Sequence, residues 1–324
     1  MSLKDITLNF SVKSIDDLLR CINLASLLEI AGWPKPGNIS RTKDFDYTRF
    51  EHLLAGIAAI QPNFRKFCEK IFASSIPKIQ DFSYVGLGNF FKEAAKDMVT
   101  WQKGGNVLLG HILILAPLAA ATTLCLKFAK YDFNDFKYYL NETINDSTVN
   151  DTKNLYEAIR ISKPGGLGKI EKYDIYDDNS IKEIQKDKIT LKEIFELSKG
   201  YDLISLEYST GFNITLNEGL PYFFDIFNQY NDINIATVNT FLKILSSHPD
   251  TLIIRKSGKE AAVNVSNLAS NILKIGGISS KEGHSLTIKL DDELQEKGGR
   301  LNPGTTADLI AGILFCAIVF GLRF

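Results

Sequence analysis

Hydrophobic residues recur along most of the chain at intervals of three and four, which is the spacing of one face of an α-helix. Residues 14–31 show this spacing clearly, with Ile15, Leu18, Leu19 and Ile22 on one face. A strand-like alternation occurs only in 3–12 and in a short piece of 284–294. The same helical spacing predicts further helices over 48–75, 89–102, 151–162, 190–212, 220–230, 235–247, 258–275 and 305–322.

The order of these elements predicts an all-α protein. No repeated alternation of strand and helix is present, which argues against a doubly wound sheet. We expect a single domain over residues 1–324, a large helical bundle with apolar helices at its centre. Two helical lobes are the alternative, joined through the polar, Asn-rich stretch 131–150, which is a loop or a helix.

Two stretches are apolar on every face, namely 107–129 and 309–322. Such a helix is either a membrane span or the centre of a large helical core. The second stretch is shorter than the roughly 18 to 20 residues that a span needs, and the first contains His111 and Pro117. In an otherwise polar chain, both features favour core helices and no membrane.

Composition narrows the possible functions. The 324 residues carry a net charge of −1, so no overall basic field attracts nucleic acid. Four separated cysteines without a C-x-x-C pair are typical of buried thiols in a reducing cytoplasm. The four histidines lack metal-ligand spacing, and the first residues lack the pattern of a signal peptide.

Helix starts can also be read from the sequence. Asp151 is expected to cap the helix over 151–162, and Thr190 with Glu193 forms a predicted capping box. Thr305 or Thr306 is expected to cap the last helix.

The turn "GWPKPGNISR" (32–41) places Lys35 between two prolines and is the first of four candidate substrate-binding turns. Lys35 and Arg41 are candidate phosphate ligands, with Asn38 beside them. In the residues that follow, Asp46 and Glu51 offer the hard oxygens that magnesium prefers. The structural alternative is a stiff loop with solvated charges.

The next two turns carry glycines beside polar residues. In "WQKGGNVLLG" (101–110), Asn106 stands where a long apolar helix begins, either as an anion ligand or only as a helix cap. In "RISKPGGLGK" (160–169), Lys163 precedes three glycines whose N–H groups can surround an anion. The alternative for this turn is an ordinary helix stop.

The fourth turn is "RLNPGTTADL" (300–309), which contains Asn302, Thr305 and Asp308. Asp308 in the first turns of a helix is electrostatically favourable, which would suffice as a structural role. Its place at the edge of a core also favours a partnered or functional carboxylate. The chain has neither the G-x-x-x-x-G-K-[ST] nor the G-x-S-x-G motif.

The chain resembles the triphosphoribosyl-dephospho-coenzyme A synthases, and specifically the archaeal and methylotroph branch of that family. The resemblance covers residues 27 to 315 and rests on the segments "LLEIAGWPKPGN", "GGNVLLGHILILAPLA", "LYEAIRISKPGGLGK", "YDLISLEYSTGF", "LIIRKSG" and "LNPGTTADLIAGILF". It implies an all-helical transferase that moves the triphosphoribosyl group of ATP to the 2′-hydroxyl of dephospho-coenzyme A and releases adenine. One departure is "GGNVLLG", where Val107 and Leu108 stand in a stretch that is commonly Asn-Thr-Asn in relatives.

The resemblance, together with the demands of glycosyl transfer, implies roles for the candidate residues. A carboxylate must stabilise the oxocarbenium-like transition state or act as base, and we expect the retained triphosphate to need cations and magnesium. ATP and dephospho-coenzyme A or a related acceptor are the implied partners, and a homodimer is an option. The candidates are Glu29 and Asp308 for catalysis; Lys35, Arg41, Lys163, Gly165, Gly166 and Gly168 for phosphates; Asn38, Asn106, Asn302 and Thr305 for substrate oxygens; Arg255 and Lys256 for the second nucleotide; and Asp46 and Glu51 for magnesium.

Two other functions stay open at this level. One is a related transferase of archaeal cofactor biosynthesis that acts on a pterin or another nucleotide, because these turns suit any phosphorylated substrate. The other is a non-catalytic helical protein that binds nucleotides, for which the departure at Val107 and Leu108 is the best support.

Overall fold

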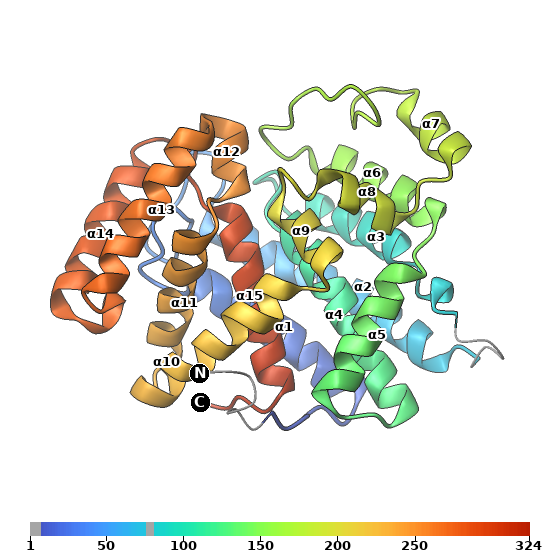
Figure 1. Cartoon of the computed structure of the whole chain (residues 1–324), viewed down its shortest axis with the longest axis horizontal. Coiled ribbons are helices and arrows are strands. Elements are labelled where there is room, and N and C mark those ends of the chain that lie inside the picture. The colour runs from blue at the N-terminus through green and yellow to red at the C-terminus, as the bar shows by residue number, and fades with distance from the viewer. Residues whose placement is uncertain (1–7, 76–80) are drawn as a thin grey trace.

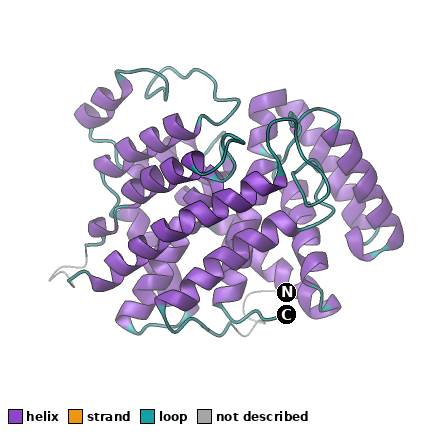
Figure 2. Cartoon of the chain, turned by 180° about the vertical axis from the view of Figure 1, so that it is seen from behind, coloured by secondary structure: helices purple, strands orange, loops and turns teal. Residues whose placement is uncertain are grey.

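The computed structural model describes residues 8–75 and 81–324, and this part of the chain is helical with no β-strand (Figure 2). The all-α prediction is therefore confirmed. The helices in chain order are α1 (Ile15–Ala31), α2 (Phe50–Ala73), α3 (Leu87–Thr100), α4 (Leu109–Phe128), α5 (Phe133–Asn145), α6 (Val149–Ser162), α7 (Ser180–Asp187), α8 (Leu191–Ser198), α9 (Leu203–Thr210), α10 (Leu220–Tyr230), α11 (Ile233–Ser247), α12 (Thr251–Ser257), α13 (Lys259–Lys274), α14 (Lys281–Gln295) and α15 (Gly304–Val319).

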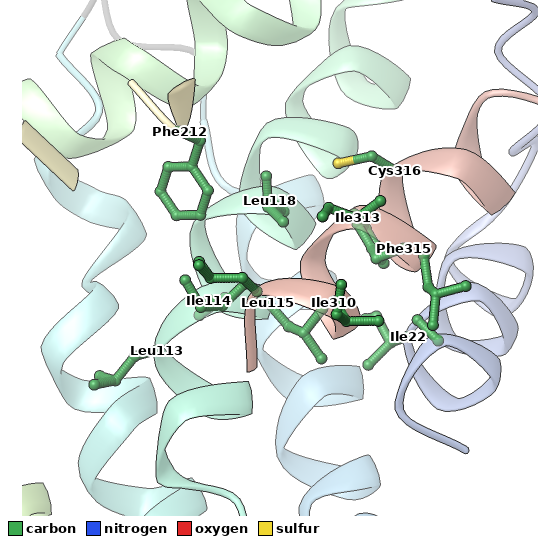
Figure 3. Close-up of a cluster of buried hydrophobic side chains, with 14 of the residues drawn as sticks. Ile22, Leu113, Ile114, Leu115, Leu118, Phe212, Ile310, Ile313, Phe315 and Cys316 are labelled. Carbon is green, nitrogen blue, oxygen red and sulfur yellow. The ribbon is translucent and has the colours of Figure 1, made fainter. Parts of the chain in front are cut away.

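The two all-apolar helices, α4 and α15, lie at the centre of the molecule (Figure 1). By length and composition α4 could cross a membrane, but 94% of its apolar window is buried inside the protein, as expected for a core helix. Ile114 and Leu118 of α4 meet Ile310 and Ile313 of α15 in the centre of the core (Figure 3). All the central helices share this one hydrophobic core.

Glycines let α4 and α15 approach closely. A Cβ at Gly312 would lie 2.7 Å from Ile114 Cγ2, and a Cβ at Gly110 would lie 1.8 Å from Asp308 Oδ2. Both distances are shorter than carbon side chains allow, so these positions require glycine. The close crossing fixes the ends of the two helices, where His111 and Asp308 lie.

The remaining helices form two groups around this centre. Helices α10 to α14 pack on one side, and α5 to α9 lie on the other (Figure 1). Helix α2 packs against α1, α3 and α4, and α3 packs against α4 and α6. The α6–α7 loop, residues 163–179, arches over the top of the molecule from a point beside α12 to α7 (Figure 1). The two groups border a common opening above α4 and α15.

Both strand predictions need correction where they can be tested. Residues 3–7 lie outside the described part, and residues 8–12 form no strand. Their backbone instead bonds to the end of α15, with Ser11 N–H donating to Val319 O at 2.8 Å. The alternating piece in 284–294 belongs to α14, because Thr287, Leu290, Asp291 and Leu294 recur at helical spacing on its buried face.

Several helix boundaries differ from the prediction. Residues 131–150 form α5 and the start of α6, and Thr148 rather than Asp151 is the N-cap, with Asp151 completing its capping box. The helix predicted over 190–212 starts with the expected Thr190–Glu193 box but breaks at 199–202 into α8 and α9. Asp202 then caps α9, because its carboxylate accepts from Ser205 N–H.

The last helix is capped from another part of the chain. Neither Thr305 nor Thr306 is its N-cap, since α15 begins at Gly304 after Pro303. Asp250, the cap of α12, accepts the Thr306 N–H at 2.7 Å and the Thr306 hydroxyl at 2.8 Å. One buried carboxylate therefore joins the starts of two helices.

Candidate active site

A cavity of about 840 Å³ opens above α4 and α15, and all four candidate turns contribute to its wall. The structure thus brings together segments that are up to 279 residues apart in the sequence. The predicted residues that line the cavity are Glu29, Asn38, Asn106, Lys163, Gly165, Gly168, Arg255, Lys256, Asn302, Thr305 and Asp308.

A chain of charged side chains forms the floor of this cavity. His111 Nδ1 lies 2.9 Å from Asp308 Oδ1, and His111 Nε2 lies 3.2 Å from Glu29 Oε2. The other Glu29 carboxylate oxygen is paired with Lys35 Nζ, which also donates to Glu29 O at 2.6 Å. The four side chains come from α1, the turn after it, α4 and α15, and together they are the charged chain of this site.

The charged chain is almost completely withdrawn from solvent. The side chains of Glu29, Lys35 and His111 are at most 3% exposed, whereas that of Asp308 is 19% exposed and faces the cavity. When the His111 imidazole is protonated, the charged chain contains two positive and two negative groups, so its net charge is zero. Burial of charges at low dielectric is tolerated only when they are paired in this way.

Burial and pairing have opposite effects on the pKa values here. Burial disfavours the imidazolium, but the hydrogen bond with Asp308 and the nearby Glu29 carboxylate outweigh it and raise the pKa of His111 to about 9. Burial alone would raise the pKa of Glu29, yet the neighbouring Lys35 ammonium and His111 lower it. For Asp308, burial dominates and its pKa is raised above the usual range.

The position of Lys35 explains the proline-rich turn that follows α1. The turn folds Lys35 back beneath the helix end, where its side chain is fully buried and its Nζ lies 5.9 Å from the centre of the Phe241 ring. Lys35 does not line the cavity. The prolines thus hold the lysine against Glu29 and away from the place where a substrate phosphate would lie.

His111 is the site residue that the sequence analysis missed. Its spacing from the other histidines argued only against a metal site. The available signal was a histidine inside an otherwise apolar helix, because a buried polar side chain needs a partner. Its neighbour Gly110 adds a second signal, since only glycine leaves room for the Asp308 carboxylate.

A group of cations lies at the rim of the cavity, formed by Lys163, Arg255 and Lys256. Lys163 ends α6 in a left-handed conformation, and Gly165 and Gly166 lie against α12, where a Cβ would be 3.3 Å from Lys256 Cε and 3.0 Å from Arg255 Cβ. Arg255 donates to Asp202 at 2.9 Å, while its buried Nε has no partner among the described residues. Gly166 itself is not a lining residue.

Asparagines line the wall between the cations and the charged chain. Asn38 Nδ2 donates to Asn302 Oδ1 at 3.1 Å, which joins the first turn to the fourth. Asn106 Oδ1 accepts from Leu109 N–H, so this residue caps the first turn of α4 and also lines the cavity. At the departure noted above, Val107 lines the cavity and Leu108 is buried in the core.

The residues considered for magnesium do not gather into a metal site. Asp46 and Glu51 are both exposed and do not line the cavity, and Glu51 is paired with Arg49 at 3.0 Å. Within residues 8–75 and 81–324, no group of three or more His, Cys, Asp or Glu side chains has an arrangement that could hold a metal. Arg41 is likewise exposed and outside the cavity lining.

Comparison with known proteins identifies the family. The sequence profile of the ATP:dephospho-CoA triphosphoribosyl transferases matches residues 15–322. A 105-residue segment is 30% identical to the 2-(5″-triphosphoribosyl)-3′-dephosphocoenzyme-A synthase of Escherichia fergusonii and to a Salmonella gallinarum protein to which the same name is assigned by inference. This segment covers 32% of the chain and only about a third, 34%, of each relative.

A solved structure extends the similarity to the fold. The crystal structure of an Archaeoglobus fulgidus protein, assigned by inference as a triphosphoribosyl-dephospho-coA synthase, matches with a TM-score of 0.62 and 26% identity. The match covers 83% of this chain and 100% of that one. Because the family profile spans nearly the whole chain, this protein belongs to the ATP:dephospho-CoA triphosphoribosyl transferase family.

Proposed function

We propose that this protein transfers the triphosphoribosyl group of ATP to the 2′-hydroxyl of 3′-dephospho-coenzyme A and releases adenine. The observation that carries this proposal is the meeting, in one cavity, of a buried carboxylate–histidine chain with a rim of cations and glycines. Family membership supports the same reaction. The four buried free cysteines support a reducing, cytoplasmic location.

Asp308 is the proposed base for the acceptor hydroxyl. It is the member of the charged chain with the greatest exposure, and its raised pKa favours proton uptake. In the transfer, the bond between ribose C1′ and adenine breaks with its electron pair on adenine, and the acceptor oxygen forms the new bond to C1′. The acceptor proton passes to Asp308 and from there to solvent, and solvent supplies the proton that the departing adenine takes up at a ring nitrogen, so that one proton moves in net from the acceptor to adenine.

His111, Glu29 and Lys35 are proposed to hold Asp308 rather than to touch the substrate. His111 Nδ1–H donates to Asp308 Oδ1 and fixes the orientation of this carboxylate, whose Oδ2 lies beside Gly110 of the cavity lining. Glu29 has both oxygens engaged, by Lys35 and His111, and thereby keeps the imidazole charged. The negative charge of Asp308 is then available to a developing positive charge at C1′.

The rim cations are proposed to hold the phosphates. Lys163, Arg255 and Lys256 supply positive charge, and the backbone N–H groups of Gly165, Leu167 and Gly168 are proposed as further donors. Asn38, Asn106, Asn302 and Thr305 are placed to meet substrate oxygens. Magnesium would enter with the triphosphate, because this ion is usually held by substrate phosphates and waters together with one or two protein oxygens.

A chromatographic assay for free adenine tests the reaction. Purified protein is incubated with ATP and magnesium, with and without dephospho-coenzyme A. Release of one adenine per acceptor consumed, only when the acceptor is present, is the expected result. Adenine release without the acceptor would indicate another natural acceptor, and no adenine from folded protein would contradict the proposal.

A further inference from the structure

The outer part of the cavity has an apolar wall that the proposed chemistry does not use. Leu167 and Ile170 of the α6–α7 loop, Ile194 and Leu197 of α8, and Tyr201 before α9 line it. Leu197 is 58% exposed, Tyr201 52% and Ile170 39%. Several large apolar side chains that remain exposed along one cavity wall indicate a binding surface, because solvent exposure of such a cluster is unfavourable.

This apolar wall is continuous with the cation rim. The loop that places Gly165 and Gly166 against Arg255 and Lys256 continues directly into Leu167 and Ile170. In Figure 1 the loop runs from the neighbourhood of α12 over the top of the molecule toward α7. A ligand whose phosphates lie at the rim can therefore extend an apolar chain along α8.

The wall is held in place before any ligand binds. The Phe195 ring of α8 stacks on Tyr208 of α9 with ring centres 4.0 Å apart, and Tyr208 donates to Leu113 O of the central helix α4. Tyr156 of α6 donates to Tyr173 O at 2.6 Å and ties the loop down. A preformed wall lowers the ordering cost of binding.

The two substrates of the proposed reaction differ in the feature that this wall recognises. ATP ends in its triphosphate and carries no apolar chain. Dephospho-coenzyme A continues beyond its pyrophosphate into the pantetheine arm, which consists of methyl and methylene groups, two amides and a thiol. We propose that the apolar wall binds the pantetheine arm of the acceptor and so selects an arm-bearing nucleotide. This inference rests on the proposed function and adds the source of acceptor specificity to it.

Leu197→Asp tests the inference, because its side chain is more than half exposed and its replacement leaves the core intact. Leu268→Asp on α13 is the matched control, an exposed leucine (43%) that does not line the cavity. The affinity of each variant for dephospho-coenzyme A alone and for ATP alone is measured by titration calorimetry. We expect Leu197→Asp to weaken the binding of dephospho-coenzyme A at least tenfold and to change the affinity for ATP less than twofold. Leu268→Asp should change neither affinity.

A second variant, Ile170→Asp, should reproduce this selective loss from the loop side of the wall. Equal weakening of both nucleotides by folded variants, or no weakening of dephospho-coenzyme A, would overturn the inference and leave the wall to another occupant such as a carrier protein. Binding of single ligands needs no turnover. If the wall variants selectively lose affinity for dephospho-coenzyme A but the parent protein releases no adenine, only the proposed reaction is contradicted. If the parent releases adenine but the variants show no selective loss of affinity, only the arm site is contradicted.

Discussion

The floor and the outer wall of the cavity are built in opposite ways. The charged chain on the floor comes from α1, α4 and α15, which are far apart in sequence, and three of its four side chains are at most 3% exposed. The outer wall comes from the α6–α7 loop, α8 and the segment before α9, which lie near one another in the chain, and its side chains are up to 58% exposed. Charges that depend on exact pairing lie in the core, whereas the apolar contacts, which have no fixed angles, lie at the periphery.

This difference has a physical cause. Buried charges gain from pairing only when every partner is in place, so the chain on the floor needs backbone that cannot move. Apolar contact is not directional, and a wall of exposed side chains can recognise an arm without fixed angles. Five experiments test this difference, and they are given in order of decreasing expected effect.

Glu29→Gln should have the largest effect on stability. It removes the carboxylate between two buried cations, and the loss of one partner from a buried pair costs about 3–5 kcal/mol. Urea unfolding measures the change. The control Glu69→Gln, at an exposed pair with Arg65, should lie within about 0.5 kcal/mol of the parent.

A double variant separates charge burial from packing at the same place. Glu29→Gln with Lys35→Met removes both the carboxylate and the ammonium that faced it, so part of the lost stability should return. If the double variant is less stable than Glu29→Gln alone, the floor is not held by the balance of charges.

Asp308→Asn should abolish most activity while the fold persists. The amide keeps the shape and can still accept from His111, but it cannot take the acceptor proton, and general-base catalysis contributes roughly 100-fold or more. Adenine release should show a lower kcat with a KM changed less than threefold. Asp292→Asn, at an exposed residue outside the cavity, is the control, and equal rates in the two variants would remove Asp308 from the mechanism.

The charged chain should make stability depend on pH above neutrality. The pKa of His111 is raised from 6.5 to about 9, so its contribution is complete below pH 6.5 and is lost as the pH rises through 9. The shift corresponds to roughly 3 kcal/mol. Unfolding free energies at pH 6 and pH 9.5 should therefore differ more in the parent than in His111→Asn, and equal differences would contradict a charged imidazole.

The smallest effect is expected at the cation rim. Lys163 lines the cavity and ends α6, whereas Arg41 is exposed and outside the lining. Lys163→Ala should raise the KM for ATP about tenfold, consistent with one lost charge-assisted hydrogen bond of about 1.5 kcal/mol. Arg41→Ala should change it less than twofold, and a reversed order would place the triphosphate at the first turn.

Much of the fold could be predicted from local pattern. Helices α1, α10 and α13 are within one or two residues of the predicted ranges, because three- and four-residue spacing is a local property. The errors arose where long-range contacts decide. The 284–294 piece alternates like a strand, but Thr287, Leu290, Asp291 and Leu294 place it in α14 with one face buried. Cap residues were also misjudged when the cap came from elsewhere, as Asp250 does for α15.

For the same reason, the sequence predicted some residues of the candidate site and missed others. Asp308, Asn302 and Lys163 stand in turns that the sequence marks with proline and glycine, and all three line the cavity. Lys35 stands in such a turn as well but folds inward to Glu29, which no local pattern reveals. His111 was missed because the sequence does not show which residues an isolated histidine in an apolar helix contacts.

Local sequence pattern was enough to show that the protein is all-helical, that its centre is made of two apolar helices, and that four polar turns punctuate the helix ends. Which charges meet followed from the packing of the helices. Glu29 and Asp308 are 279 residues apart, and they share one imidazole because Gly110 and Gly312 let α4 and α15 cross closely. Secondary structure follows from contacts over a few residues, whereas the balance of four buried charges exists only once three helices have packed together.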